Sequence, residues 1–142
     1  MPAALGAKVA APDKPVIAVI GDGGYQMTIQ ELGTIMQYKI PVKILVLNNN
    51  FLGMVRQWQQ LFHGKRYSFT EMQNPDFVKI AEAYGIPAAK VTEQKDLEAA
   101  LKKMLAAPTS YFLEVVVEKE DNVFPMVPAG AGVAEVILEL PK

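Results

Sequence analysis

The stretch VIAVIGDGGYQMTIQELGTIMQ, residues 16–37, decides the fold, because Gly-Asp-Gly-Gly joins an apolar run to an amphipathic segment. Val16–Ile20 has the length and apolar character of a buried strand. From Thr28 to Tyr38, apolar residues recur at helical spacing. We therefore expect a strand, a polar turn and a helix, followed by a second strand at Val42–Asn48.

The remainder of the chain continues this alternation. We expect a helix with Asn74 as its N-cap and Pro75 in its first position, ending at Gly85. The later expected elements are a strand at Ala88–Val91, a helix capped by Thr92 and a strand at Tyr111–Val117. Strands that alternate with helices through short connections predict an α/β fold, a parallel sheet with helices on both faces.

The length of 142 residues fits one domain. We divide it into residues 1–120 and an irregular wrapping tail, residues 121–142, which begins rich in proline and glycine. The net charge of −1 without a basic stripe argues against nucleic-acid binding. The absence of cysteine excludes thiolate metal sites. The apolar runs are too short for a membrane span, and the start of the chain does not resemble a signal peptide, so we expect a cytoplasmic location.

Polar residues follow both of the first two expected strands. The carboxyl ends of neighbouring parallel strands meet at one sheet edge, where ligands of open α/β sheets bind, so Asp22 and Asn48–Asn50 should face one another there. A carboxylate, an amide oxygen and a main-chain carbonyl suit Mg²⁺, which completes its shell with water and phosphate. Gly23 and Gly24 would let backbone N–H groups approach a phosphate. The sequence thus predicts a site for a metal-bound diphosphate.

The same residues have a purely structural interpretation, because Gly-Asp-Gly and Asn-Asn are also common turn sequences. Their combination at two linked strand ends favours the site. The dinucleotide fingerprint is not met, since Gln26 stands where its last glycine belongs, and no Gly-Lys-Ser/Thr phosphate loop occurs.

These motifs resemble a known family. Gly21-Asp22-Gly23, followed after twenty-four residues by Asn48-Asn49, resembles the thiamine diphosphate signature of pyruvate-oxidase-like enzymes. The segments GMVRQWQQLF, RYSFT and NPDFVKIAEAYG, with FPMVPAGAG near the end, resemble the C-terminal domain of the acetolactate synthase large catalytic subunit. The resemblance covers nearly the whole chain.

The resemblance implies roles for individual residues. Asp22, the Asn49 side chain and the main-chain oxygen of Phe51 would hold Mg²⁺. The implied contacts with thiamine diphosphate comprise these residues and Gly21, Gly23, Gly24, Gly53 and Met54. Met54 would also face the substrates, together with Trp58, which in this family favours 2-ketobutyrate as second substrate. Met54 and Trp58 share a face if their segment is helical.

The implied activity is the decarboxylation of pyruvate and the transfer of its two-carbon unit to pyruvate or 2-ketobutyrate, in branched-chain amino acid biosynthesis. No catalytic residue is expected in this chain, because the activating glutamate of the family lies in a separate pyrimidine-binding domain. FAD belongs to another domain of the full-length family enzyme, which is an oligomer and can carry a regulatory subunit.

We further expect the first strand of the domain and its glycine-rich loop to precede this chain, and the chain alone to be inactive. Two alternatives remain open. The domain could belong to another thiamine diphosphate enzyme, such as a 2-keto acid decarboxylase, a pyruvate oxidase or glyoxylate carboligase. It could instead be a non-catalytic remnant that serves as an interaction module.

Overall fold

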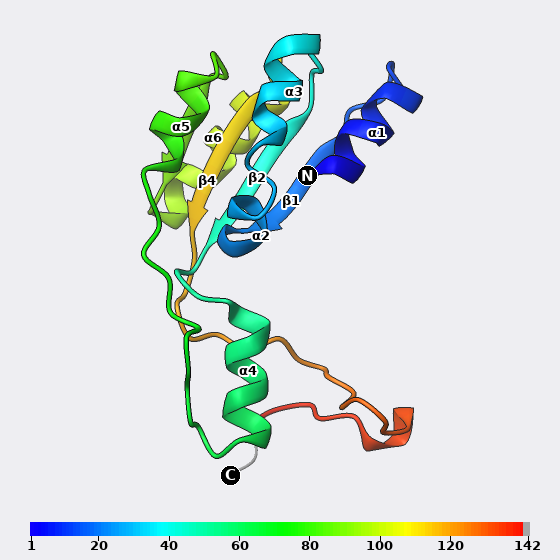
Figure 1. The fold of residues 1–142 in the computed structure, drawn as a ribbon, viewed down its shortest axis with the longest axis vertical. Helices are drawn as coiled ribbons and strands as arrows, with labels where there is room; N and C mark the ends of the chain where they lie inside the picture. The colour runs from blue at the N-terminus through cyan, green and yellow to red at the C-terminus, as the bar shows by residue number, and fades with distance from the viewer. Residues whose placement is uncertain (141–142) are drawn as a thin grey trace.

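A four-stranded, all-parallel sheet forms the centre of the computed structural model, which describes residues 1–140 (Figure 1). The strand order is β1-β2-β4-β3, so β2 and β4 lie in the middle and β1 and β3 at the two edges. Their bounds are Ile17–Gly21 for β1, Lys43–Asn48 for β2, Ala88–Val91 for β3 and Tyr111–Val116 for β4. The predicted parallel sheet is confirmed.

Helices cover both faces of the sheet. One core joins α1, α2, α3 and α5 to the sheet and is centred on Ile44, Val46 and Phe112. The other lies between α6 and the β3–β4 half, where Leu113 and Val115 meet Met104. The helices are α1 Pro2–Ala10, α2 Asp22–Gln26, α3 Glu31–Tyr38, α4 Gly53–Phe62, α5 Phe77–Ala83 and α6 Gln94–Ala106, followed by the short 3₁₀ helix η1 Val133–Glu135.

The segment after β1 differs from the expected single helix. It forms a short α2 that starts at Asp22 and a separate α3 that starts at Glu31. The Thr28 hydroxyl donates to the Gly24 carbonyl oxygen at 3.0 Å, a local bond of the kind that competes with helix continuation. α2 therefore ends at Gln26, and Thr28 lies in the turn before α3 instead of beginning the second helix.

Two predicted helix caps are wrong. α5 is capped by Asp76, whose carboxylate accepts a hydrogen bond from the Lys79 N–H at 3.1 Å, and not by Asn74. This bond lowers the pKa of Asp76. α6 has Glu93 and not Thr92 at its N-cap. The Asn74 side chain is used elsewhere, as described below.

α4 and the chain after β4 lie beyond the carboxyl edge of the sheet (Figure 1). Gln57 is buried and holds this chain through both of its amide atoms, accepting from the Val123 N–H at 2.8 Å and donating to the Val123 carbonyl at 2.9 Å. Residues 141–142, the end of the expected tail, lie outside the described residues. Within residues 1–140, no helix has both the length and the apolar character needed to cross a bilayer.

Candidate functional site

A cavity of about 550 Å³ opens where β1 and β2 end and α4 begins. Eight predicted site residues line it: Gly21, Asp22, Gly23, Gly24, Asn49, Phe51, Gly53 and Met54. They come from two segments, residues 21–24 and 49–54, which the pairing of β1 with β2 brings to one edge. The expectation that both strand ends contribute to one site therefore agrees with the structure.

Asp22 is the first residue of α2 and is only 1% exposed, although it borders the cavity. Its Oδ1 accepts the Gly23 N–H at 3.0 Å, and its Oδ2 accepts the Asn74 Nδ2–H at 2.7 Å. A carboxylate has about four lone-pair sites, so each oxygen keeps capacity for another ligand. Asp22 is thus a fixed anionic oxygen donor.

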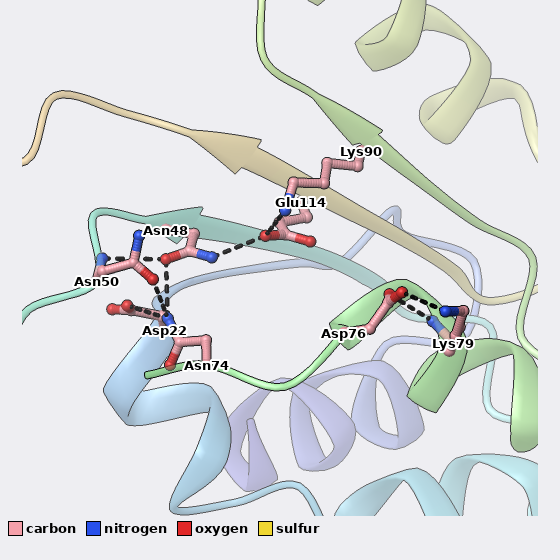
Figure 2. Close-up of polar contacts among 8 residues, drawn as sticks. All are labelled: Asp22, Asn48, Asn50, Asn74, Asp76, Lys79, Lys90 and Glu114. Carbon is pink, nitrogen blue, oxygen red and sulfur yellow. Dashed lines mark hydrogen bonds and ion pairs between the residues drawn. The ribbon is translucent and has the colours of Figure 1, made fainter. Parts of the chain in front are cut away.

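The three consecutive asparagines have three different positions. Asn48 is buried and its Oδ1 accepts the Asn50 N–H at 3.0 Å (Figure 2). Asn49 borders the cavity, and its Oδ1 accepts the Phe51 N–H at 3.1 Å. Asn50 has φ 55°, in the left-handed region that asparagine tolerates better than most residues. The run therefore ends β2 in a tight turn that presents Asn49 and Phe51 to the cavity.

This turn is held from its outer side. Leu52 N–H donates to the Thr70 carbonyl and Met72 N–H to the Asn50 carbonyl, each at 2.8 Å. The Arg56 guanidinium lies 5.2 Å from the centre of the Phe51 ring. Among residues 1–140, no hydrogen bond to the Phe51 carbonyl oxygen is formed. That oxygen is therefore available as a ligand.

The charges at the cavity are all acidic. Asp22, Glu118 and Asp121 line it, whereas no lysine or arginine of the described chain does. No three His, Cys, Asp or Glu side chains of residues 1–140 gather as a metal cluster. A cation here would be held by one carboxylate, an amide and a carbonyl oxygen, which is the hard oxygen set that Mg²⁺ accepts when a phosphate completes its shell. The donors present fit a magnesium–diphosphate group.

Comparison with known proteins decides the family. A family profile described as "Thiamine pyrophosphate enzyme, C-terminal TPP binding domain" matches residues 1–115. The chain belongs to this family.

Individual relatives of this thiamine pyrophosphate (TPP) domain are acetolactate synthases. The large subunit of Porphyra purpurea is 48% identical over 139 residues, which are 96% of this chain and 24% of that protein. The isozyme 2 large subunit of Escherichia coli K12 is 46% identical, over 99% of this chain and 26% of that protein. The chain spans about a quarter of the length of these two relatives.

A solved structure supports the fold of the TPP domain. The thiamine diphosphate-dependent 4-hydroxybenzoylformate decarboxylase of Rhodococcus jostii RHA1 superposes with a TM-score of 0.78 at 37% identity. The match covers 85% of this chain and 23% of that one.

The two glycines of α2 in the TPP domain differ in what surrounds them. A Cβ on Gly23 would come within 2.6 Å of Leu52 Cδ2 and 3.3 Å of Met72 Sδ, whereas a Cβ on Gly24 would meet only Ile20 Cγ2 at 3.9 Å. Gly23 is buried and its N–H is bonded to Asp22, while Gly24 is exposed. Close packing therefore accounts for Gly23, and Gly24 has the more accessible backbone.

Gly53 affects the cavity in another way. A Cβ at this position would lie 3.0 Å from Asn49 Nδ2, tighter than nearly all real contacts. The missing side chain thus leaves room for the Asn49 amide beside the start of α4.

Trp58 lies apart from the eight cavity residues. It is on α4 as expected, one turn after Met54, but it borders a second pocket with His63, which shares Val55 with the cavity. The centre of its ring lies 4.9 Å from the centre of the Phe62 ring. The structure therefore places Met54 at the cavity and Trp58 beyond it.

Sequence reasoning missed two residues that support the candidate site from behind the cavity. Asn74 reaches Asp22, Asn48 and Asn50 from the segment before α5, and Glu114 of β4 bonds to Asn48 (Figure 2). A signal for Glu114 exists in the sequence, because a lone carboxylate in the apolar run YFLEVVV requires a polar partner once that strand is buried.

Proposed function

We propose that this chain is the cofactor-binding part of an acetolactate synthase, and that it binds thiamine diphosphate through Mg²⁺. The single observation that carries the proposal is the convergence of Asp22, Asn49 and Phe51 on one cavity at the carboxyl edge of the sheet. The acidic lining supports it, because a diphosphate would be repelled there unless a divalent cation lay between.

Each group of residues has a distinct task in this proposal. Asp22, Asn49 and Phe51 hold the cation, and the accessible backbone of Gly24 contacts the diphosphate. Leu47, Met54 and Val117 give the cavity an apolar wall that keeps water away from the reacting carbon. When bound, thiamine diphosphate supplies the nucleophilic carbon and the electron sink for removing carbon dioxide from pyruvate. Positioning and water exclusion are thus the contributions of this chain.

The proposal extends to the intact enzyme. Its substrates are pyruvate and 2-ketobutyrate, its products are 2-acetolactate and 2-aceto-2-hydroxybutyrate, and the activating glutamate and FAD come from other domains. Assembly as a homo-oligomer, a regulatory subunit and a cytoplasmic location belong to the same proposal. We also propose that residues 1–120 and the tail, residues 121–142, form one cofactor-binding domain. The identities of 46–48% to acetolactate synthases support this choice over another enzyme of the family.

Calorimetric titration of the intact gene product with thiamine diphosphate tests cofactor binding. We expect heat of binding with Mg²⁺ and little without it, and loss of the Mg²⁺-dependent binding in Asp22→Ala. Gly6→Ala is a suitable control, because nothing lies within 4 Å of a Cβ at that position. Equal binding with and without the metal would contradict the proposal.

The reaction class is tested by product analysis. With pyruvate and 2-ketobutyrate supplied together, the intact enzyme should form mainly 2-aceto-2-hydroxybutyrate, and Trp58→Leu should shift the ratio towards 2-acetolactate. Release of acetaldehyde as the main product would point to a decarboxylase, and an unchanged ratio in the variant would remove the role proposed for Trp58.

A further inference from the structure

Glu114 is a buried carboxylate with no direct contact to the cavity. It lies in the middle of β4 and is 3% exposed, on the same sheet face as Ile44 and Phe112. Its Oε1 accepts the Asn48 Nδ2–H at 2.7 Å and lies 2.9 Å from Lys90 Nζ (Figure 2). Burying a carboxylate is costly even when it is paired, so a residue of this kind needs an explanation.

Glu114 determines the orientation of the Asn48 amide. A carboxylate can only accept hydrogen bonds, so the Asn48 NH₂ group must face it and the Asn48 oxygen must face the other way. On that other side Oδ1 accepts from the Asn50 N–H at 3.0 Å and from Asn74 Nδ2 at 2.9 Å. Rotating the amide by 180° would set donor against donor and oxygen against carboxylate. Glu114 therefore fixes the turn that follows Asn48.

A second amide, that of Asn74, is oriented in the same way and reaches Asp22. Gln26 Nε2 donates to Asn74 Oδ1 at 2.7 Å, so the Asn74 NH₂ group faces three acceptors: Asp22 Oδ2 at 2.7 Å, Asn48 Oδ1 at 2.9 Å and Asn50 Oδ1 at 3.1 Å. Asn74 is the group that joins the end of β1 to the end of β2 through side chains (Figure 2). A path of hydrogen bonds thus runs from Glu114 through Asn48 and Asn74 to Asp22.

We propose that Glu114 is a positioning residue for the divalent cation, acting through Asn48 and Asn74 to hold the Asp22 carboxylate and the 49–51 turn in the binding geometry. This inference rests on the proposed function, because it assigns a supporting role to a site that the proposal describes. It adds a residue that makes no contact with the cation, the cofactor or the substrate.

The decisive experiment measures cation affinity in the intact gene product with three variants. Glu114→Met keeps the size of the side chain but accepts no comparable hydrogen bond, whereas Glu114→Gln keeps an oxygen that can accept from Asn48. Leu113→Ala is the matched control, since Leu113 is its buried neighbour on the opposite sheet face, packed towards α6. The apparent dissociation constant for Mg²⁺ is measured at saturating thiamine diphosphate, with Mn²⁺ binding by paramagnetic resonance as a second readout.

We expect Glu114→Met to weaken cation binding by about 10-fold, the lower end of the range for removal of a direct partner of a metal ligand, because two side chains lie between Glu114 and Asp22. Glu114→Gln should lie much closer to wild type. Leu113→Ala should lower the free energy of unfolding while leaving the cation constant of the folded protein unchanged. If Leu113→Ala weakens cation binding as much as Glu114→Met does, the effect is general destabilisation and the inference is wrong.

A double-mutant cycle tests the path itself. If Glu114 acts through Asn74, then Glu114→Met combined with Asn74→Ala should cost little more cation affinity than the worse single variant. Additive losses would overturn the path. If wild type shows no Mg²⁺-dependent binding at all, the proposed function fails and the inference falls with it. If wild type binds and Glu114→Met binds equally well, only the inference fails.

Discussion

Gly23 and Gly24 offer a comparison in which one methyl group is placed in two neighbouring positions of α2. The Gly23→Ala methyl would overlap Leu52 Cδ2 at 2.6 Å and press on Met72 Sδ at 3.3 Å. The Gly24→Ala methyl would make one ordinary contact, at 3.9 Å from Ile20 Cγ2. Both glycines lie in the same helix, so the gain in helix propensity is common to the two variants.

The magnitude follows from two opposing effects. Alanine in place of a helical glycine stabilises by up to about 1 kcal/mol. Insertion of a methyl group into a filled site costs about 1–3 kcal/mol, and the lower part of this range applies here because the end of the Leu52 side chain can rotate away. Gly24→Ala should therefore be neutral or more stable than wild type. Gly23→Ala should unfold with a free energy about 1 kcal/mol below that of Gly24→Ala.

Urea unfolding followed by circular dichroism, without cofactor, measures this difference. The two midpoints should separate at equal slope, with Gly23→Ala the lower. Coincident midpoints would refute the packing explanation for Gly23. Contact with the diphosphate would then be the remaining reason for a glycine at this position. A lower midpoint for Gly24→Ala would reverse the reasoning altogether.

Three further predictions concern single side chains. Tyr25→Phe should raise the free energy of unfolding by about 1 kcal/mol, because the buried hydroxyl has no hydrogen-bond partner among the described residues. Burial raises the pKa of Tyr25 in the folded protein. Above about pH 10 the tyrosine ionises only in the unfolded chain, so the wild type should lose stability there. Melting temperatures measured against pH should fall less in Tyr25→Phe. Gly53→Ala should press on the Asn49 amide and weaken Mg²⁺ binding in calorimetry more than it lowers the melting temperature. Gln57→Leu should remove both bonds to Val123, and limited proteolysis of residues 117–140 should become faster; an unchanged cleavage rate would count against that anchor.

The strands and the cavity edge could be predicted from the sequence because both depend on local signals. Val16–Ile20 and Val42–Asn48 are apolar runs of strand length, observed as Ile17–Gly21 and Lys43–Asn48. Parallel pairing then brings their polar ends together, whatever the remaining contacts are. Asp22, Gly23, Gly24 and Asn49 were found from these two strand ends, whereas the family resemblance implied the other four cavity residues, Gly21, Phe51, Gly53 and Met54.

Asn74 could not be placed in this way. Asn-Pro-Asp before an apolar helix offers two good capping side chains, and only the tertiary structure selects between them. Asp76 takes the cap, while Asn74, separated from Asp22 by 52 residues, lies against the end of β1. Trp58 shows the same limit, since helical spacing puts it on the face of Met54 but does not say how far the cavity extends.

On the two central strands, the face that packs against α2, α3 and α5 changes from apolar to polar residues towards the site. On β2 this face carries Ile44, Val46 and then Asn48, and on β4 Phe112 is followed by Glu114, which pairs in register with Val46. A leucine at position 114 would suit the surrounding apolar core and avoid the cost of burying a carboxylate, so packing alone does not account for the residue present. The carboxylate is explained by the Asn48 amide. This amide is held in one orientation because its NH₂ group donates to the Glu114 carboxylate. A cation site at this edge therefore depends on the interior of the sheet as well as on the residues that line the cavity.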